Sequence, residues 1–187
     1  MDTIKTGKKT LDEMLSGGSL TVIAGRPGMG KSSLAFQTAG NIAECGKRVL
    51  LFSLEMDEPL VRKRMSMQGF EACENNVIVY DEPAVSVEYI TQKATDLEKI
   101  DAIFVDYIQL MRGKNNKLSS CKQEVEEIVS GLKLLAEKMN VPIVVVSQLG
   151  RNADSVTDES ELIASVRKAG FREQDTDWII FPPHMLN

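Results

Sequence analysis

Short apolar runs alternate along the chain with longer stretches in which apolar residues recur every three or four positions. The short runs predict buried strands, and the periodic stretches predict helices with one buried face. Strands are expected at six runs: Leu20–Ala24, Arg48–Ser53, Asn76–Tyr80, Ala102–Val105, Ile143–Val146 and Trp178–Phe181. Helices are expected at Ser32–Cys45, Glu58–Gln68, Ser86–Lys99 and along the apolar stripe from Val125 to Met139.

Strands that are apolar throughout, separated by helices, are typical of a parallel sheet covered by helices on both faces. The length of 187 residues fits a single domain with a full core of its own. We therefore expect one three-layer α/β domain over residues 1–187, with a mainly parallel sheet. Two stretches without periodicity, Arg112–Ser120 and Gly150–Ser160, are expected to be loops.

Composition narrows the class of protein. Lys and Arg number 22 against 27 Asp and Glu, so the net charge is -5. This excludes a uniformly basic nucleic-acid binder and requires any polyanion contact to come from a local patch. The three cysteines are far apart, which favours reduced thiols over a disulfide framework or a zinc site. With no leader sequence and no membrane-spanning run in the chain, we expect a cytoplasmic protein without a membrane partner.

The strongest motif is Gly25-Arg26-Pro27-Gly28-Met29-Gly30-Lys31-Ser32, which fits the P-loop pattern between a predicted strand and a predicted helix. Its glycines let backbone N–H groups approach phosphates, and the helix start adds positive potential. Lys31 supplies a mobile cation. We expect this segment to bind the phosphates of a nucleoside triphosphate through eight residues: Arg26, Pro27, Gly28, Met29, Gly30, Lys31, Ser32 and Ser33.

A magnesium site is predicted beside this P-loop. The Ser32 hydroxyl is a suitable hard ligand for Mg²⁺. Asp106 is the first acid after the apolar run Ala102–Val105, the form of a Walker B strand. Because the carboxyl ends of parallel strands share one edge of the sheet, Ser32 and Asp106 should converge there.

Two further polar residues follow predicted strands and should reach the same edge. Glu55 comes directly after Arg48–Ser53 and is a candidate to polarise an attacking water, or else a solvated acid near a helix start. Gln148 follows Ile143–Val146, where its amide could hydrogen-bond the γ-phosphate or the water. Spacing alone leaves both alternatives open.

Several phrases together resemble the RecA-like ATPase domain of DnaB-type replicative helicases. The resemblance runs through nearly the whole chain and includes Phe52-Ser53-Leu54-Glu55-Met56, a specific phrase of that family. The other matching segments are Thr6–Met14, the P-loop, Asp106–Met111, Leu132–Ala136, Asn140–Pro142, Ser147–Leu149 and Arg167–Asp177.

The resemblance implies a RecA-like P-loop fold and ATP-driven translocation on single-stranded DNA by a ring of six subunits, with other replication proteins as partners. It implies that Glu55 is the catalytic base, Asp106 the Walker B acid and Gln148 the sensor. It also implies that a loop around Arg167, Lys168 and Gly170 touches the DNA backbone. An acidic residue usually stands where Lys168 does, and four residues near Ile163–Val166 look inserted.

Charge patterning gives separate support for a DNA contact. The stretch from Tyr107 to Gln123 contains no acid but carries four cations: Arg112, Lys114, Lys117 and Lys122. Such a patch would bind phosphates in a salt-dependent manner. The alternative is an ordinary solvated loop, because the stretch has no aromatic residue beyond Tyr107 for base stacking.

Two parts of the family pattern have no counterpart in this sequence. The family's N-terminal domain and linker helix do not precede Thr6, and no Lys-x-Arg finger follows Trp178–Phe181. Arginine fingers contribute several orders of magnitude to the rates of other P-loop enzymes. We therefore expect this chain alone to bind ATP but to hydrolyse it slowly.

The leading hypothesis is thus the ATP-hydrolysing core of a DnaB-like helicase. One alternative is a nucleotide-binding regulator that does not unwind DNA. Another is an interaction module that joins a second helicase ring. Recombinases share the fold, but the Phe52–Met56 phrase argues against them.

Overall fold

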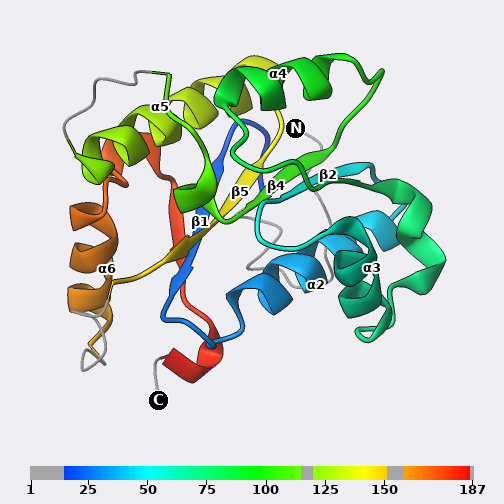
Figure 1. Ribbon diagram of the computed structural model, residues 1–187, viewed down its shortest axis with the longest axis horizontal. Coiled ribbons are helices and arrows are strands. Elements are labelled where there is room, and N and C mark those ends of the chain that lie inside the picture. The colour runs from blue at the N-terminus through cyan, green and yellow to red at the C-terminus, as the bar shows by residue number, and fades with distance from the viewer. Residues whose placement is uncertain (1–14, 115–119, 151–157, 186–187) are drawn as a thin grey trace.

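The computed structural model describes residues 15–114, 120–150 and 158–185. Six strands form one parallel sheet in the order β3-β2-β4-β5-β1-β6 (Figure 1). Their bounds are β1 Leu20–Gly25, β2 Val49–Ser53, β3 Val77–Tyr80, β4 Ala102–Asp106, β5 Ile143–Gln148 and β6 Trp178–Ile180. All six predicted strands are present, with ends within two residues of the prediction.

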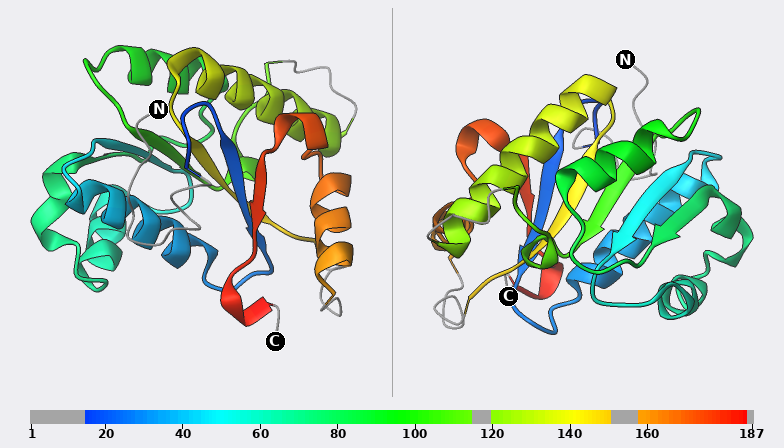
Figure 2. Two further views of the ribbon diagram at one scale, coloured as in Figure 1. Left: turned by 180° about the vertical axis from the view of Figure 1, so that it is seen from behind. Right: turned by 45° about the horizontal axis from the view of Figure 1, so that its top comes forward.

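Helices cover both faces of this sheet (Figure 2). The helices are α2 Lys31–Glu44, α3 Glu58–Ser66, α4 Val87–Thr95, α5 Cys121–Met139 and α6 Glu159–Lys168. Short 3₁₀ turns are η1 Glu71–Asn76, η2 Ile108–Leu110, η4 Glu173–Asp175 and η5 Pro183–Met185. Helices α2 and α3 lie on one face, whereas α4 and α5 lie on the other. The three-layer α/β prediction is confirmed.

Consecutive strand residues point to opposite faces, so each strand contributes to two cores. Leu51 packs with Phe36 of α2 and Val61 of α3. The next residue, Phe52, packs on the other face with Ile90 of α4. Since both faces are covered, every residue of β2 and β4 is buried, which explains why these strands read as unbroken apolar runs.

The entry into β1 is tied to two distant parts of the chain. Asp177 accepts a hydrogen bond from the backbone N–H of Leu20 at 2.7 Å and pairs with Lys133 of α5 at 2.8 Å. This network joins the start of β1, the approach to β6 and the covering helix. It fixes the strand that leads into the glycine-rich turn at Gly25.

Helix α6 corrects the sequence prediction. The sequence predicts a loop over Gly150–Ser160, and the family resemblance implies one around Arg167 and Lys168, but Glu159, Ser160, Arg167 and Lys168 are all helical. The Asp158 carboxylate starts this helix by accepting hydrogen bonds from the N–H groups of Ser160 and Glu161. Leu162 and Val166, four residues apart, then bury one face. Residues 151–157 of the expected loop lie outside the described part.

No described helix has both the length and the apolar character needed to cross a membrane.

Candidate functional site

A cleft of about 350 Å³ lies at the edge of the sheet where β1, β2, β4 and β5 end. Parallel α/β sheets bind ligands at this edge. The cleft is lined by Pro27, Gly28, Gly30, Lys31, Ser32, Ser33, Glu55, Met56, Arg64, Asp106, Tyr107, Val146 and Gln148. The three strand-end residues that the sequence singled out, Glu55, Asp106 and Gln148, therefore meet the P-loop in one place.

The glycine-rich turn after β1 has the backbone of an anion cradle. Gly28 and Gly30 have φ angles of 76° and 81°, and a Cβ built on either one meets no atom within 4 Å. The space in front of them is thus open, and only glycine adopts these angles without strain. Gly30 begins α2 without a side-chain cap, so the first N–H groups of this helix stay available to an anion.

Lys31 is held over this cradle by its own loop. Its Nζ donates a hydrogen bond of 2.8 Å to the carbonyl oxygen of Arg26. Burial lowers the pKa of Lys31, and the charges of Asp106 and Glu55 act in the opposite direction. The half-buried ammonium therefore stands between the phosphate cradle and two carboxylates.

Asp106 ends β4 opposite Ser53 of β2 and is only 1% exposed. Among the described residues, none gives either of its carboxylate oxygens a hydrogen bond of good geometry. Burial raises the pKa of Asp106 to about 6, although the nearby Ser32 hydroxyl opposes the rise. A buried, unsatisfied carboxylate beside a hydroxyl fits a hard divalent cation, because the cation would supply the missing partner.

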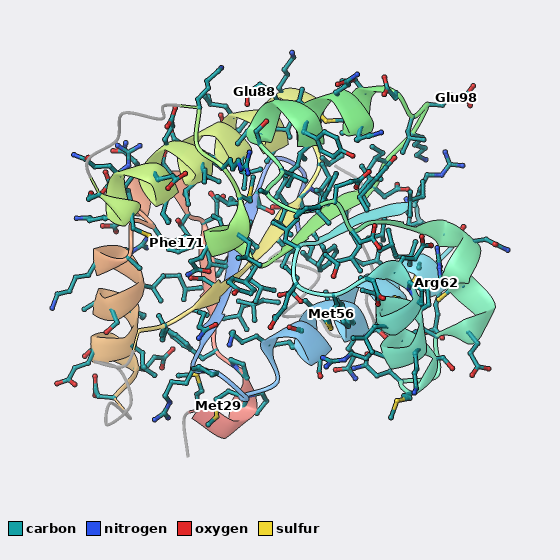
Figure 3. All side chains as sticks on the ribbon, in the orientation of Figure 1. Met29, Met56, Arg62, Glu88, Glu98 and Phe171 are labelled. Atoms are coloured by element: carbon teal, nitrogen blue, oxygen red, sulfur yellow. The ribbon has the colours of Figure 1, made fainter. Side chains whose placement is uncertain are left out.

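Glu55 is presented to the cleft by a tight turn after β2. The Ser53 hydroxyl donates a hydrogen bond of 2.7 Å to the Met56 carbonyl oxygen, which closes the turn around Glu55. Met56 packs into the core with α2, above which it is labelled in Figure 3. Glu55 itself is exposed, so a solvated carboxylate faces the buried Asp106 across the cleft.

Gln148 is the last residue of β5 and lies beside Gly25 of β1 in the parallel register. Its side chain is exposed and lines the cleft. Its backbone is held by the side chain of Gln109, a residue for which the sequence predicted no individual role.

Arg64 also lines the cleft, although no sequence motif predicted a role for it there. It lies on α3, beside the buried residue Met65 of the same helix. Its positive charge lowers the pKa of Asp106, against the larger effect of burial. The sequence signal that could have indicated this role is a basic residue in the helix that begins shortly after Glu55.

Two residues of the predicted cradle do not line the cleft. Arg26 contributes its carbonyl oxygen to Lys31. Met29 packs its side chain against the core, and Figure 3 places it near the last turn of the chain. Arg26 and Met29 thus serve the loop itself, whereas the other six predicted cradle residues line the cleft.

The predicted basic loop is less free than its sequence indicates. Lys114 pairs with Glu88 of α4 at 2.7 Å, and Lys122 pairs with Glu126 of α5 at 3.5 Å. Arg112 is exposed, and Lys117 lies outside the described residues. The stretch lacks acids of its own, but neighbouring helices supply them.

The second predicted DNA contact also differs from the expected loop. Arg167 donates a hydrogen bond of 3.0 Å to the carbonyl oxygen of Phe171, and Lys168 is exposed in the last turn of α6. Gly170 is buried with a φ of 114°, and a Cβ there would come within 2.9 Å of the Lys122 carbonyl oxygen. Gly170 therefore serves close packing between α6 and α5.

A separate groove of about 590 Å³ lies between α4, α5 and residues 112–114. Arg112, Lys114 and Arg172 line it, so the segments after β4 and after α6 meet there. Glu88, Glu126 and Glu127 line the same groove. Its charge is mixed, and it does not form a uniformly basic track.

Comparison with known proteins identifies a family that matches this chain. The chain matches the DnaB-like helicase C-terminal domain over residues 3–75 and 64–184. It is 30% identical over 210 residues to the replicative DNA helicase DnaB of Geobacillus stearothermophilus, covering 95% of this chain and 46% of that protein. The replicative DNA helicase DnaC of Bacillus subtilis matches to the same extent. This chain thus spans about half the length of the curated relatives it matches.

Solved structures give the same result. The ATPase domain of G40P superposes with a TM-score of 0.81 at 26% identity, covering 95% of this chain and 75% of that one. A DnaB-like replicative helicase, solved in a study of its interactions with primase, gives a TM-score of 0.82 at 25% identity, covering 97% of this chain and 53% of that one. The RecA-like fold expected from the sequence is confirmed. Because the family match extends over nearly the whole chain, this protein belongs to the DnaB-like helicase C-terminal domain family.

Proposed function

We propose that residues 1–187 form one ATPase domain that hydrolyses ATP and uses the energy to move along single-stranded DNA and unwind duplex DNA. The observation that carries this proposal is the convergence of a phosphate cradle, a buried carboxylate and an exposed carboxylate in one cleft. Membership of a helicase family supports the coupling to DNA.

In this proposal the cradle binds the triphosphate. The N–H groups from Gly28 to Ser33 point at the β- and γ-phosphates, and Lys31 neutralises their charge. Ser32 and Asp106 would hold Mg²⁺, which when bound shields the phosphate oxygens. The ionised form of the buried Asp106 would be favoured when Mg²⁺ is bound.

Glu55 and Gln148 act on the γ-phosphate side. Glu55 is exposed and lies across the cleft from the cradle, so it can accept a hydrogen bond from the attacking water and orient it. Gln148 is uncharged and can hydrogen-bond a phosphate oxygen, so its contacts differ between ATP and ADP. That difference makes it suited to report the nucleotide state.

The test is ATP hydrolysis by the full chain with and without a single-stranded oligonucleotide, together with strand displacement from a forked duplex. DNA-stimulated hydrolysis with displacement is the expected result, and Glu55→Gln should abolish both. Nucleotide binding without any hydrolysis would overturn the enzymatic part of the proposal. Hydrolysis that DNA leaves unchanged would overturn the coupling.

The proposed partners are single-stranded DNA and further copies of the chain in a ring of six. The relatives are replicative DNA helicases, and one structural neighbour was solved in a study of its interactions with primase. A replication protein of that kind is the further partner we propose. Light scattering with Mg²⁺, an ATP analogue and an oligonucleotide measures the assembly directly.

A second candidate is a nucleotide-binding regulator that does not translocate. It is favoured by the ion pairs that occupy Lys114 and Lys122, because paired cations are less available to phosphates. This candidate expects the same nucleotide affinity with and without DNA.

A further inference from the structure

The side chain of Gln109 forms hydrogen bonds with both the backbone N–H and the backbone carbonyl of Gln148. Gln109 Oε1 accepts a hydrogen bond of 3.3 Å from the Gln148 N–H, and Gln109 Nε2 donates one of 3.0 Å to the Gln148 carbonyl oxygen. The same Nε2 also donates to the Ser147 hydroxyl at 2.9 Å. Three contacts thus join η2 to the end of β5.

We call these three hydrogen bonds from Gln109 the clamp. The pattern of strand pairing explains why the end of β5 needs it. Alternate residues of β5 direct both backbone groups to the same neighbouring strand. Ile143 and Leu149 donate to β1 and its approach, whereas the preceding residue Pro142 accepts from Ile103 of β4. Gln148 therefore directs its N–H and carbonyl toward the β4 side. There the chain has already left the sheet after Asp106, and the Gln109 amide takes the place of the missing strand residue.

The chain after Gln109 leads directly to the groove between α4 and α5. Met111 is buried, so η2 and the residue after it are anchored as one unit. The Arg112 N–H donates to the Val85 carbonyl oxygen at 3.0 Å, and the Gly113 N–H donates to the Glu124 carboxylate at 2.9 Å. One short segment therefore spans from the nucleotide cleft to the exposed cations at 112 and 114.

We propose that Gln109 is a positioning residue that couples the Gln148 end of β5 to residues 110–114. When Gln148 shifts to follow the γ-phosphate, the clamp carries the shift into η2 and so into the presentation of Arg112 and Lys114. The proposal rests on the proposed function in one respect, that the cleft binds a nucleoside triphosphate. The proposal adds a structural connection between that cleft and the groove between α4 and α5.

An amide is the side-chain group suited to this position, because it has a donor and an acceptor at the same end. Gln109→Glu keeps the shape but replaces the donor by a second acceptor, which would face the Gln148 carbonyl oxygen. Gln109→Ala removes all three contacts. Gln92→Ala is the matched control, because Gln92 is an exposed glutamine on α4.

The experiment is hydrogen exchange of the full chain with and without the β,γ-imido analogue of ATP and Mg²⁺, read in peptides over the P-loop, residues 107–114 and the end of β5. In wild type and Gln92→Ala, the analogue should slow exchange in all three regions. In both Gln109 variants the P-loop should respond as before. The slowing of exchange that the analogue causes in residues 107–114 should fall by about five- to tenfold. This is the effect expected when one or two coupling hydrogen bonds are lost.

Steady-state kinetics add a readout that a purely structural role would not move. The Gln109 variants should lower kcat and its stimulation by single-stranded DNA while KM for ATP and the thermal midpoint stay near wild type. An undiminished response of residues 107–114 in the variants, or no response there in wild type, overturns the coupling while leaving the proposed ATPase intact. Failure of the analogue to protect even the P-loop overturns both. A third outcome is possible: protection of residues 107–114 depends on Gln109, but DNA does not stimulate hydrolysis. This result upholds the coupling and removes the DNA part of the proposed function.

Discussion

The backbone N–H of Leu54 donates a hydrogen bond of 2.7 Å to the carbonyl oxygen of Asp106. This contact joins the turn that presents Glu55 to the strand end that presents the buried carboxylate. The backbone segments that carry the exposed acid and the buried acid are therefore tied together by main-chain atoms. The difference in their burial supports the roles proposed for them, toward water for Glu55 and toward a cation for Asp106.

Glu55→Gln should retain nucleotide binding and lose hydrolysis. The amide keeps the shape of the side chain but cannot take up a proton, so the loss in kcat should be about 10²–10⁴-fold. Single-turnover hydrolysis with a separate titration of a fluorescent ATP analogue measures both properties. The control is Glu98→Gln, an exposed acid that Figure 3 places at the far edge of the molecule. Unchanged hydrolysis in Glu55→Gln would remove Glu55 from the role of base.

Asp106→Asn should stabilise the metal-free protein at neutral pH. The pKa of Asp106 is about 6 in the folded chain against 3.8 ordinarily, so folding favours the protonated form. The stability that this form contributes is fully present below about pH 4 and is lost as the pH rises through about 6. The variant avoids that loss, which amounts to about 3 kcal/mol at most.

Urea unfolding in chelator at several pH values checks this expectation. The variant and wild type should be equally stable near pH 4, with the gap opening to its full size above pH 6. Added Mg²⁺ should narrow the gap by stabilising wild type alone. A constant gap across this range would show that Asp106 does not titrate as its burial indicates.

Gly28→Ala should weaken nucleotide binding beyond the loss of stability that backbone strain causes. Gly28 and Gly46 have nearly equal φ angles, 76° and 73°, and neither has an atom within 4 Å of an added Cβ. Alanine at either site should therefore cost a similar stability, about 1–2 kcal/mol. Only Gly28→Ala should weaken nucleotide binding, because its methyl group would occupy the approach to the phosphates. Equal nucleotide affinity in the two variants would argue against the cradle.

Glu88→Gln should strengthen binding of single-stranded DNA if Lys114 contacts phosphates. The Glu88 carboxylate competes for the Lys114 ammonium, and its hydrogen bond with Lys114 lowers the pKa of Glu88. Removing the competitor frees one cation, which should steepen the salt dependence of log K by about 0.7. Fluorescence anisotropy at several salt concentrations measures the slope. The same slope in Glu88→Gln and wild type would exclude Lys114 as a phosphate contact.

The nucleotide cleft could be predicted from the sequence because its parts obey rules of local pattern. The P-loop and the acid that ends Ala102–Val105 are each defined by neighbours in the chain, and the parallel sheet brings them together. The pairing of Lys114 with Glu88 could not be predicted in this way, because it joins residues on different elements through side-chain packing. Helix α6 was missed because its two buried apolar residues and a single Asp cap form a short signal beside a polar stretch.

Arg64→Ala tests a residue that only the structure brought into the site. Arg64 lines the cleft from α3, and its charge favours the ionised form of Asp106. Its loss should reduce nucleotide affinity or kcat by about tenfold, the effect of one charge-assisted contact. Arg62→Ala is the matched control, since Arg62 lies on the same helix and pairs with Glu58 at 2.6 Å. If Arg64→Ala and Arg62→Ala have the same kinetics, Arg64 belongs to the surface of α3 alone. If Arg64→Lys restores most of the activity, the charge is what the cleft uses.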